Sequence, residues 1–243
     1  MNDPDKSLDN TFGQQTVSQQ QRSQKIRRVF QLVAPRYDLM NDFMSFGTHR
    51  IWKRFFVNSI AFKSTDIIVD LAGGTGDIAR RLLKKGADVV VIDPGLEMMQ
   101  QGKKKHNVQL KNIAATGEKL PLADNSIDKL TISFGIRNMT SMSAALKEIN
   151  RVLKPGVQYY CLEFSRPIMP VRPFYNFYNR TIIPRLGALV AGQPEAYQYL
   201  IESIQRFPDQ EEMKSLLEEA GFSQVIYRNI FFGIACIHIA HKD

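Results

Sequence analysis

The segment Asp70-Leu-Ala-Gly-Gly-Thr-Gly-Asp77 constrains the fold of this chain more than any other part of it. It follows an apolar run at residues 67–69 and leads into a helical pattern at residues 78–83, which predicts a strand, a glycine loop and a helix. Glycine can adopt positive φ and let a ligand approach the backbone, while free N–H groups at the start of the helix attract that ligand. The segment therefore predicts a site for a nucleotide-like cofactor.

The loop by itself leaves two classes of cofactor open. Gly74, Gly76 and Ala79 fit the G-x-G-x-x-A fingerprint of dinucleotide-binding proteins, and Asp93 ends the next strand, where it can bind ribose hydroxyls. Asp70, however, ends the strand before the loop, where S-adenosylmethionine enzymes carry a carboxylate that helps to hold the methionine ammonium group. We therefore favour S-adenosylmethionine, with Asp93 on its ribose. A glycine turn that only packs the helix on the strand is the alternative.

The rest of the chain alternates strand and helix patterns. Its 243 residues, 44% of them hydrophobic, suit one α/β domain with a full core. The predicted strands are 67–71, 89–93, 108–114, 130–134, 158–164, 224–231 and 234–240, and the predicted helices are 77–85, 95–105, 141–153 and 209–220. This alternation predicts a parallel, doubly wound sheet that binds ligands at the carboxyl ends of its strands.

Composition sets the boundaries of the domain. Residues 1–24 are rich in glutamine and poor in aliphatic side chains, which predicts a mobile polar tail. We expect a single domain over 25–243, with an N-terminal cap at 25–62 that folds over the glycine loop and a substrate-side insert at 166–206. The cap opens with a helix at 25–34.

Two features indicate the compartment. Cys161 and Cys236 both fall in predicted buried strands, so we expect no disulfide and a reducing environment. The chain has neither the start of a secretion signal nor an apolar run of about 20 residues, so we expect neither export nor a membrane span.

The formal net charge of +8 fits an anionic membrane surface, a nucleic acid, or solubility alone. Two absences weaken the nucleic-acid interpretation: an Asn/Asp-Pro-Pro-Tyr/Phe tetrapeptide does not follow the strand at 130–134, and no loop cysteine is placed to attack a pyrimidine ring. Arg137 and Asn138 follow that strand instead, where a reacting methyl group should lie, and are the first candidates for contact with the acceptor.

Two further segments resemble the ubiquinone/menaquinone biosynthesis C-methyltransferases. One runs from Tyr37 through Asp38, Met40, Asn41, Ser45 and His49 to Trp52, and the other comprises Arg151-Val-Leu-Lys-Pro-Gly156 and Leu162-Glu163-Phe-Ser165. The resemblance covers about residues 25–243. It implies a class I S-adenosylmethionine-dependent methyltransferase, with a Rossmann-like, doubly wound, mostly parallel sheet whose last strand is antiparallel.

The resemblance also implies a reaction, the C-methylation of a polyprenylated benzoquinol or naphthoquinol with S-adenosylmethionine as methyl donor. Arg137 would stabilise the quinolate, and Asn138, Tyr37, Asp38 and His49 would align the ring or relay its proton, although a structural role is the stronger expectation for His49. The expected cofactor-binding residues are Asp70, Gly73, Gly74, Thr75, Gly76, Asp93, Thr116, Gly117 and Ser133. Cys and His residues nowhere have metal-ligand spacing, so we expect no metal.

An acceptor with a long prenyl tail implies further partners. We expect a cytoplasmic protein, peripherally associated with the inner face of the membrane, in a homodimer or a quinone-biosynthesis complex, and no nucleic-acid partner. The aromatic insert at 166–206, with arginines at its flanks, is predicted to cover the acceptor and lead its tail toward the bilayer; a packed helical hairpin is the alternative. The rival functions are an RNA or small-molecule methyltransferase, a nicotinamide oxidoreductase and a non-catalytic cofactor-binding subunit.

Overall fold

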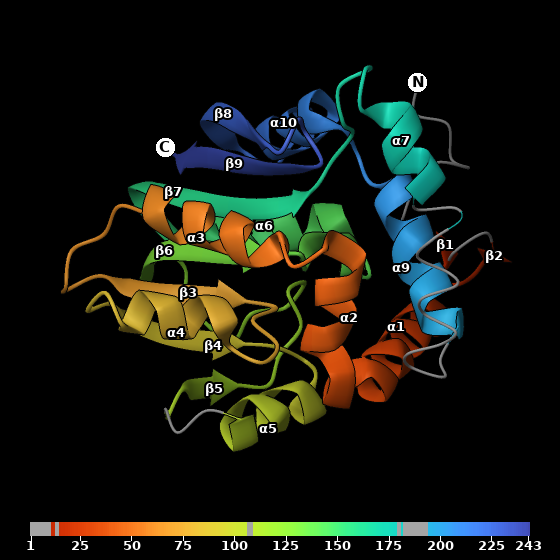
Figure 1. The fold of residues 1–243 in the computed structure, drawn as a ribbon. Helices are drawn as coiled ribbons and strands as arrows, with labels where there is room; N and C mark the ends of the chain where they lie inside the picture. The colour runs from red at the N-terminus through yellow and green to blue at the C-terminus, as the bar shows by residue number, and fades with distance from the viewer. Residues whose placement is uncertain (1–10, 13–14, 106–108, 179–180, 182–193) are drawn as a thin grey trace.

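A seven-stranded sheet forms the centre of the computed structural model, which describes residues 11–12, 15–105, 109–178, 181 and 194–243 (Figure 1). The strand order is β5-β4-β3-β6-β7-β9-β8, and β9 runs antiparallel to both of its neighbours while the other pairs are parallel. The strands are β3 (Ile67–Leu71), β4 (Asp88–Ile92), β5 (Lys111–Ile113), β6 (Ile127–Ser133), β7 (Leu153–Phe164), β8 (Phe222–Ile230) and β9 (Ala235–Lys242). This arrangement confirms the predicted fold class.

Helices pack on both faces of the sheet, and the central strand β3 has apolar side chains on both sides. Ile68 packs in one cluster with α3 (His49–Ser59) and α4 (Asp77–Leu83). Its neighbours Val69 and Leu71 pack in another cluster with α6 (Met142–Val152) and α10 (Gln210–Glu219). Successive side chains of a strand point to opposite faces, so this alternation follows from the sequence.

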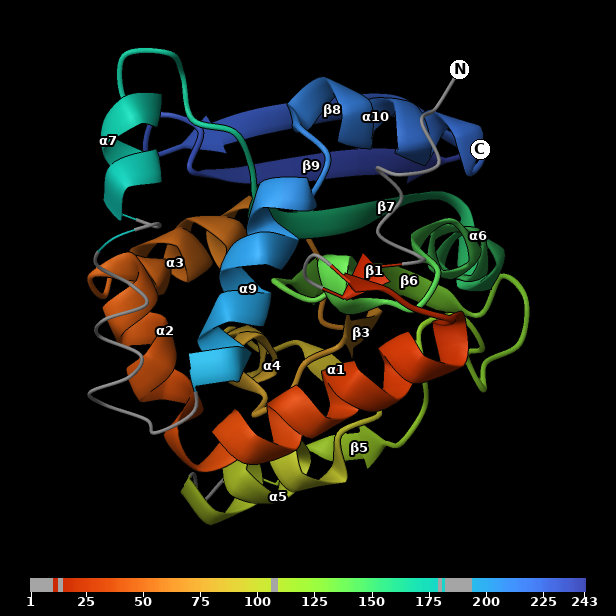
Figure 2. The same ribbon diagram turned by 90° about the vertical axis from the view of Figure 1, so that its right-hand side faces the viewer.

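The carboxyl ends of the parallel strands are covered by segments from both ends of the chain. Figure 1 shows α1 (Gln19–Val33), α2 (Tyr37–Ser45), α7 (Arg172–Phe177) and α9 (Pro194–Arg206) at this end, and in Figure 2 α1 and α9 cross in front of it. Ile26 and Val29 of α1 share an apolar cluster with Tyr199 and Leu200 of α9. On the lower edge lies α5 (Leu96–Lys105).

The prediction of a mobile tail over 1–24 and a first helix at 25–34 is wrong for the described part of that segment. A short hairpin, β1 (Thr11–Phe12) with β2 (Gln15–Thr16), precedes α1, which begins at Gln19 after a capping box at Ser18. The cause is tertiary: the buried Arg22 guanidinium donates to the carbonyl oxygens of Arg137 and Met139. Residues 1–10 and 13–14 lie outside the described part.

Other boundaries shift by a few residues. The strand predicted at 158–164 begins earlier, at Leu153. The residues between the pairs Ile127–Leu153 and Lys129–Gln158 form a bulge that includes Gly156, so the strand continues through the predicted turn. About a third of the predicted insert, residues 179–180 and 182–193, lies outside the described part.

Within the described residues, none of the helices is both long and apolar enough to cross a membrane. The two cysteines are buried free thiols, as the sequence predicts.

Candidate active site

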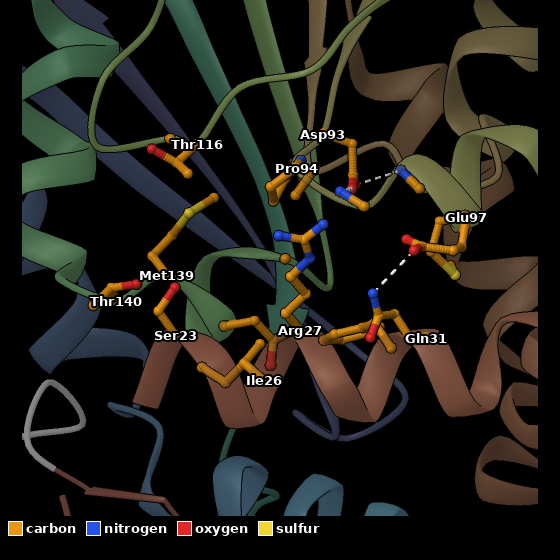
Figure 3. A pocket seen from close by; sticks show the side chains of 18 of the residues that line it. Ser23, Ile26, Arg27, Gln31, Asp93, Pro94, Glu97, Thr116, Met139 and Thr140 are labelled. Carbon is orange, nitrogen blue, oxygen red and sulfur yellow. Dashed lines mark hydrogen bonds between the residues drawn. The ribbon is translucent and has the colours of Figure 1, made fainter. Parts of the chain in front are cut away.

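A cavity of about 220 Å³ lies between α1 and the carboxyl ends of the central strands. In Figure 3, side chains of α1 form one side of it and the loops after the strands form the other. The lining residues are Ser23, Ile26, Arg27, Phe30, Gln31, Tyr37, Ala72, Gly74, Asp93, Pro94, Gly95, Glu97, Met98, Thr116, Gly117, Glu118, Phe134, Gly135, Asn138, Met139 and Thr140. The N-terminal cap and the glycine loop therefore line the same cavity.

The glycine loop forms one wall with bare backbone. Gly74 lines the cavity with φ 55°, and Gly76, which caps α4, has φ 78°. Residues with a side chain rarely adopt these left-handed conformations. A Cβ on Gly73 would lie 2.8 Å from the Asp70 carboxylate, which is too close for any non-bonded contact. The loop thus fits the cofactor-binding role predicted for it.

Asp93 connects this loop to the end of β4. Its Oδ2 accepts a hydrogen bond from the Gly74 N–H (2.8 Å), and its Oδ1 accepts one from the Gly95 N–H (2.7 Å). The side chain is buried but lines the cavity, and burial raises the pKa of its carboxyl group. A carboxylate fixed in this way has lone pairs left for a diol, which fits the predicted ribose contact.

Asp70 lies beneath the loop, outside the cavity lining. Its Oδ2 accepts a hydrogen bond from the Ala79 N–H (3.1 Å), and its Oδ1 accepts one from the Thr131 hydroxyl (3.1 Å). Burial raises the pKa of Asp70 to about 7. The observed contacts hold the first turn of α4 against the sheet, so a direct contact with a methionine ammonium group stays a prediction.

The loop after β5 forms the opposite wall. Thr116 and Gly117, two of the expected cofactor-binding residues, both line the cavity beside Met139. A Cβ on Gly117 would lie 2.7 Å from the Met139 sulfur, so only glycine lets this methionine pack there. The cavity lining at Gly117 and Met139 is largely apolar, which fits a purine ring.

Asn138 and Tyr37 face the same cavity from the end of β6 and from α2. The Asn138 amide is fixed at both ends: its Nδ2 donates to the Phe134 carbonyl (3.3 Å), and its Oδ1 accepts from the Tyr199 hydroxyl (3.0 Å). Burial raises the pKa of Tyr199 to about 12, so this hydroxyl stays a donor. The cavity thus holds one rigid amide and one phenol next to the glycine loop.

Arg137 points away from the cavity. Its Nη1 lies 2.6 Å from Glu163 Oε1 and also donates to the Phe134 carbonyl (2.9 Å). Arg137 and Glu163 are 5% and 1% exposed, so the pair is shut off from solvent. Arg137 is outside the cavity lining, so its predicted contact with a quinolate stays a prediction.

Several other predicted residues lie outside this lining. His49 is buried, with its Nδ1 2.9 Å from the Ser45 hydroxyl, and burial lowers its pKa to about 4, so it is neutral at pH 7. This environment is that of a structural histidine, the stronger expectation for it. The remaining residues outside the lining are Asp38, Gly73, Thr75, Gly76 and Ser133. Their predicted contacts stay predictions.

The sequence model of the ubiE/COQ5 methyltransferase family matches residues 17–242. The chain belongs to this family. It is 53% identical over 242 residues, 100% of this chain and 96% of the relative, to the ubiquinone/menaquinone biosynthesis C-methyltransferase UbiE of Rubrivivax gelatinosus. The UbiE protein of Escherichia coli is 42% identical over 98% of this chain and 99% of its own. Membership confirms the resemblance and the predicted methyltransferase, whose methyl donor is S-adenosylmethionine.

Solved structures support the fold alone, because their sequences are distant. A SAM-dependent methyltransferase from Thermotoga maritima superposes with a TM-score of 0.66 at 18% identity, over 90% of this chain and 100% of its own. A Haemonchus contortus phosphoethanolamine N-methyltransferase, crystallised with phosphomonomethylethanolamine and S-adenosylhomocysteine, gives 0.54 at 14% identity, over 80% of this chain and 52% of its own. These likenesses agree with the fold class of the family.

Among the residues of this site that sequence reasoning did not assign are Glu163, Tyr199 and Arg22. Glu163 carried a signal, since a carboxylate inside a buried strand needs a partner. Tyr199 and Arg22 carried none: the first lies in an insert without clear periodicity, and the second in a glutamine-rich segment.

Among the residues that the structure describes, none of the groups of His, Cys, Asp and Glu could hold a metal ion.

Proposed function

We propose that this methyltransferase transfers the methyl group of S-adenosylmethionine to a ring carbon of a polyprenylated quinol, either a benzoquinol or a naphthoquinol. The observation that carries the proposal is the single cavity in which the glycine loop and Asp93 meet Asn138 and Tyr37. The names of the full-length relatives, which refer to ubiquinone and menaquinone biosynthesis, support the class of acceptor.

The cofactor would lie along the glycine wall, with Gly74 and Asp93 at its ribose and methionine parts and Thr116 and Gly117 at its adenine. When bound, S-adenosylmethionine supplies an electrophilic methyl group. A quinol carbon becomes a competent nucleophile when the neighbouring hydroxyl loses its proton, so the protein must hold the ring and favour that loss. Asn138, locked by its two hydrogen bonds, and the Tyr37 phenol are placed to bind the quinol oxygens.

In this proposal Arg137 is a positioning residue. Its Nη1 bond to the Phe134 carbonyl and its pair with Glu163 fix the turn that presents Asn138 to the cavity. The charge of the Arg137 guanidinium is largely cancelled by the adjacent Glu163 carboxylate, so the pair exerts only a weak electrostatic attraction on a quinolate beyond the turn. Arg137 therefore acts through the backbone that carries Asn138.

A direct assay tests the function. The purified protein is incubated with S-adenosylmethionine and a short-tail, chemically reduced acceptor of each ring class, and products are identified by mass. We expect a product heavier by one methylene from at least one of them. Asn138→Ala should lower turnover at least 10-fold while S-adenosylhomocysteine binding stays unchanged. Tighter binding of NAD than of S-adenosylhomocysteine, methylation of RNA alone, or binding of the cofactor without any turnover would each favour a rival function.

We also propose that α7 contacts the membrane that holds the acceptor. Phe174 and Phe177 are 77% and 63% exposed on this helix. Residues 164–194 contain four arginines and no acid, a charge that suits an anionic surface. A Phe174→Ser, Phe177→Ser variant should lose flotation with anionic liposomes but keep its fold. Phe55→Ser, which removes an aromatic side chain that is 54% exposed on α3, is the control. Equal flotation of both variants would contradict the proposal.

A further inference from the structure

A second cavity, of about 260 Å³, lies between the α2–α3 corner, α7 and the turn that joins β8 to β9. Its main lining side chains are Phe46, Trp52, Phe164, Tyr178, Phe231 and Ile234. The Ser45 and Thr48 hydroxyls in the lining are already used, because Ser45 donates to the Asn41 carbonyl (2.7 Å) and Thr48 donates to the Ser45 carbonyl (2.5 Å). A cavity with so few free polar partners suits hydrocarbon better than water.

One layer of aromatic rings separates this cavity from the cofactor cavity. Phe134 lines the first cavity, and its ring centroid lies 4.8 Å from that of Phe164 and 6.2 Å from that of Trp52, which both line the second. A molecule whose reacting ring occupies the first cavity near Asn138 needs to pass only this layer for its remainder to enter the second.

Costly backbone conformations present phenylalanine rings at the outer side of this cavity. Phe46 is 73% exposed at φ 49° and stacks on Tyr178 with ring centroids 4.7 Å apart. Phe231 and its neighbour Phe232 have φ 49° and 59° in the turn after β8. Positive φ is unfavourable for bulky side chains, and exposure of the rings to water is unfavourable as well. Strain of this kind in the described chain points to a function at the opening.

The inner side offers one unsatisfied donor. Trp52 is 2% exposed, and its indole N–H has no acceptor among the described residues. Its ring touches Phe134, Phe164 and Phe231, so it bridges the wall and the outer rings. A ligand that is hydrocarbon over most of its length and carries an oxygen at its inner end would match this lining.

We propose that the second cavity binds the isoprenoid tail of the acceptor next to its ring. The tail enters between Phe46, Tyr178 and Phe231, and its ring end lies at the Phe134–Trp52 wall. This inference rests on the proposed quinol acceptor, and it adds the place where the hydrocarbon is held. The methyl groups of an isoprenoid chain fill a cavity lined by aromatic faces through close van der Waals contact.

Trp52 makes the cavity testable without catalysis, because it is the only tryptophan of the chain. Farnesol, an isoprenoid that lacks the quinol ring, is titrated against the protein while tryptophan emission is recorded. We expect a saturable change in Trp52 emission. Val171→Phe, which places a ring in the cavity, should weaken farnesol binding at least 10-fold. Ile168→Phe adds the same ring at a half-exposed position outside the lining and is the matched control.

Binding of S-adenosylhomocysteine and the urea midpoint of each variant show whether its fold is intact. Unchanged Trp52 emission in the wild-type protein, or equal farnesol binding by the two folded variants, would overturn the proposal. If Val171→Phe does not fold, Phe231→Ser, at a partly exposed lining position, replaces it under the same criterion. If the protein binds farnesol but methylates no quinol, the second cavity is still an isoprenoid site, whereas the proposed function is wrong.

Discussion

The buried pair of Arg137 and Glu163 allows the sharpest test of how this site is built. Arg137→Met removes the charge and keeps most of the side-chain volume. Glu163 then keeps its bond from the Phe164 N–H (2.9 Å) but loses the guanidinium 2.6 Å away. Removal of one partner from a buried pair typically lowers stability by about 3–5 kcal/mol, because the other charge stays uncompensated.

For Arg137→Met at pH 7, we expect a stability loss at the low end of this range of about 3–5 kcal/mol. In the variant, the buried Glu163 carboxylate can become neutral by taking up a proton. From the ordinary pKa of 4.5, this protonation costs about 3.4 kcal/mol at pH 7. Burial raises the pKa of Glu163 in the folded protein, whereas Arg137 opposes that rise. The protonated form of Glu163 therefore contributes stability to the folded protein. This contribution is complete below the ordinary pKa and is lost as pH rises through the raised pKa. The loss caused by Arg137→Met should shrink to about 1 kcal/mol near pH 5.

Urea unfolding at pH 7 and pH 5, followed by Trp52 fluorescence, measures these differences. The double variant Arg137→Met, Glu163→Gln should recover most of the loss, since neither charge remains to be buried. Arg166→Met, which breaks an exposed pair with Asp209, should change stability by less than about 1 kcal/mol. If Arg137→Met is as stable as the wild-type protein and yet fails to turn over, the guanidinium acts on the acceptor and the positioning role is wrong.

Asp93→Ala should weaken S-adenosylhomocysteine binding by about 1–3 kcal/mol in calorimetry, because the ribose diol and two loop N–H groups lose their acceptor; equal affinity would remove Asp93 from the site. Tyr37→Phe should keep the fold and lose most of its methyl transfer, and a fully active variant would reduce Tyr37 to packing. Trp52→Ala should lower the free energy of unfolding by about 3–5 kcal/mol in urea, whereas a loss below about 1 kcal/mol would contradict its place in the core.

The sequence determined those features that depend on short-range pattern. The glycine loop appears at Asp70–Asp77 as predicted, because apolar runs of strand length and glycines at fixed spacing are local signals. Asp93, Thr116 and Gly117 line one cavity because the carboxyl ends of parallel strands meet at one edge, whatever the details of packing.

The tertiary structure decided what each side chain faces. Arg22 is buried because carbonyl groups more than 100 residues along the chain accept its hydrogen bonds, and no local pattern encodes such partners. Arg137 follows the predicted strand, yet its guanidinium turns to Glu163, since a buried carboxylate attracts it more strongly than an open cavity does. Periodicity places the backbone of a residue at the site, but the direction of its side chain depends on partners that only the folded chain brings within reach.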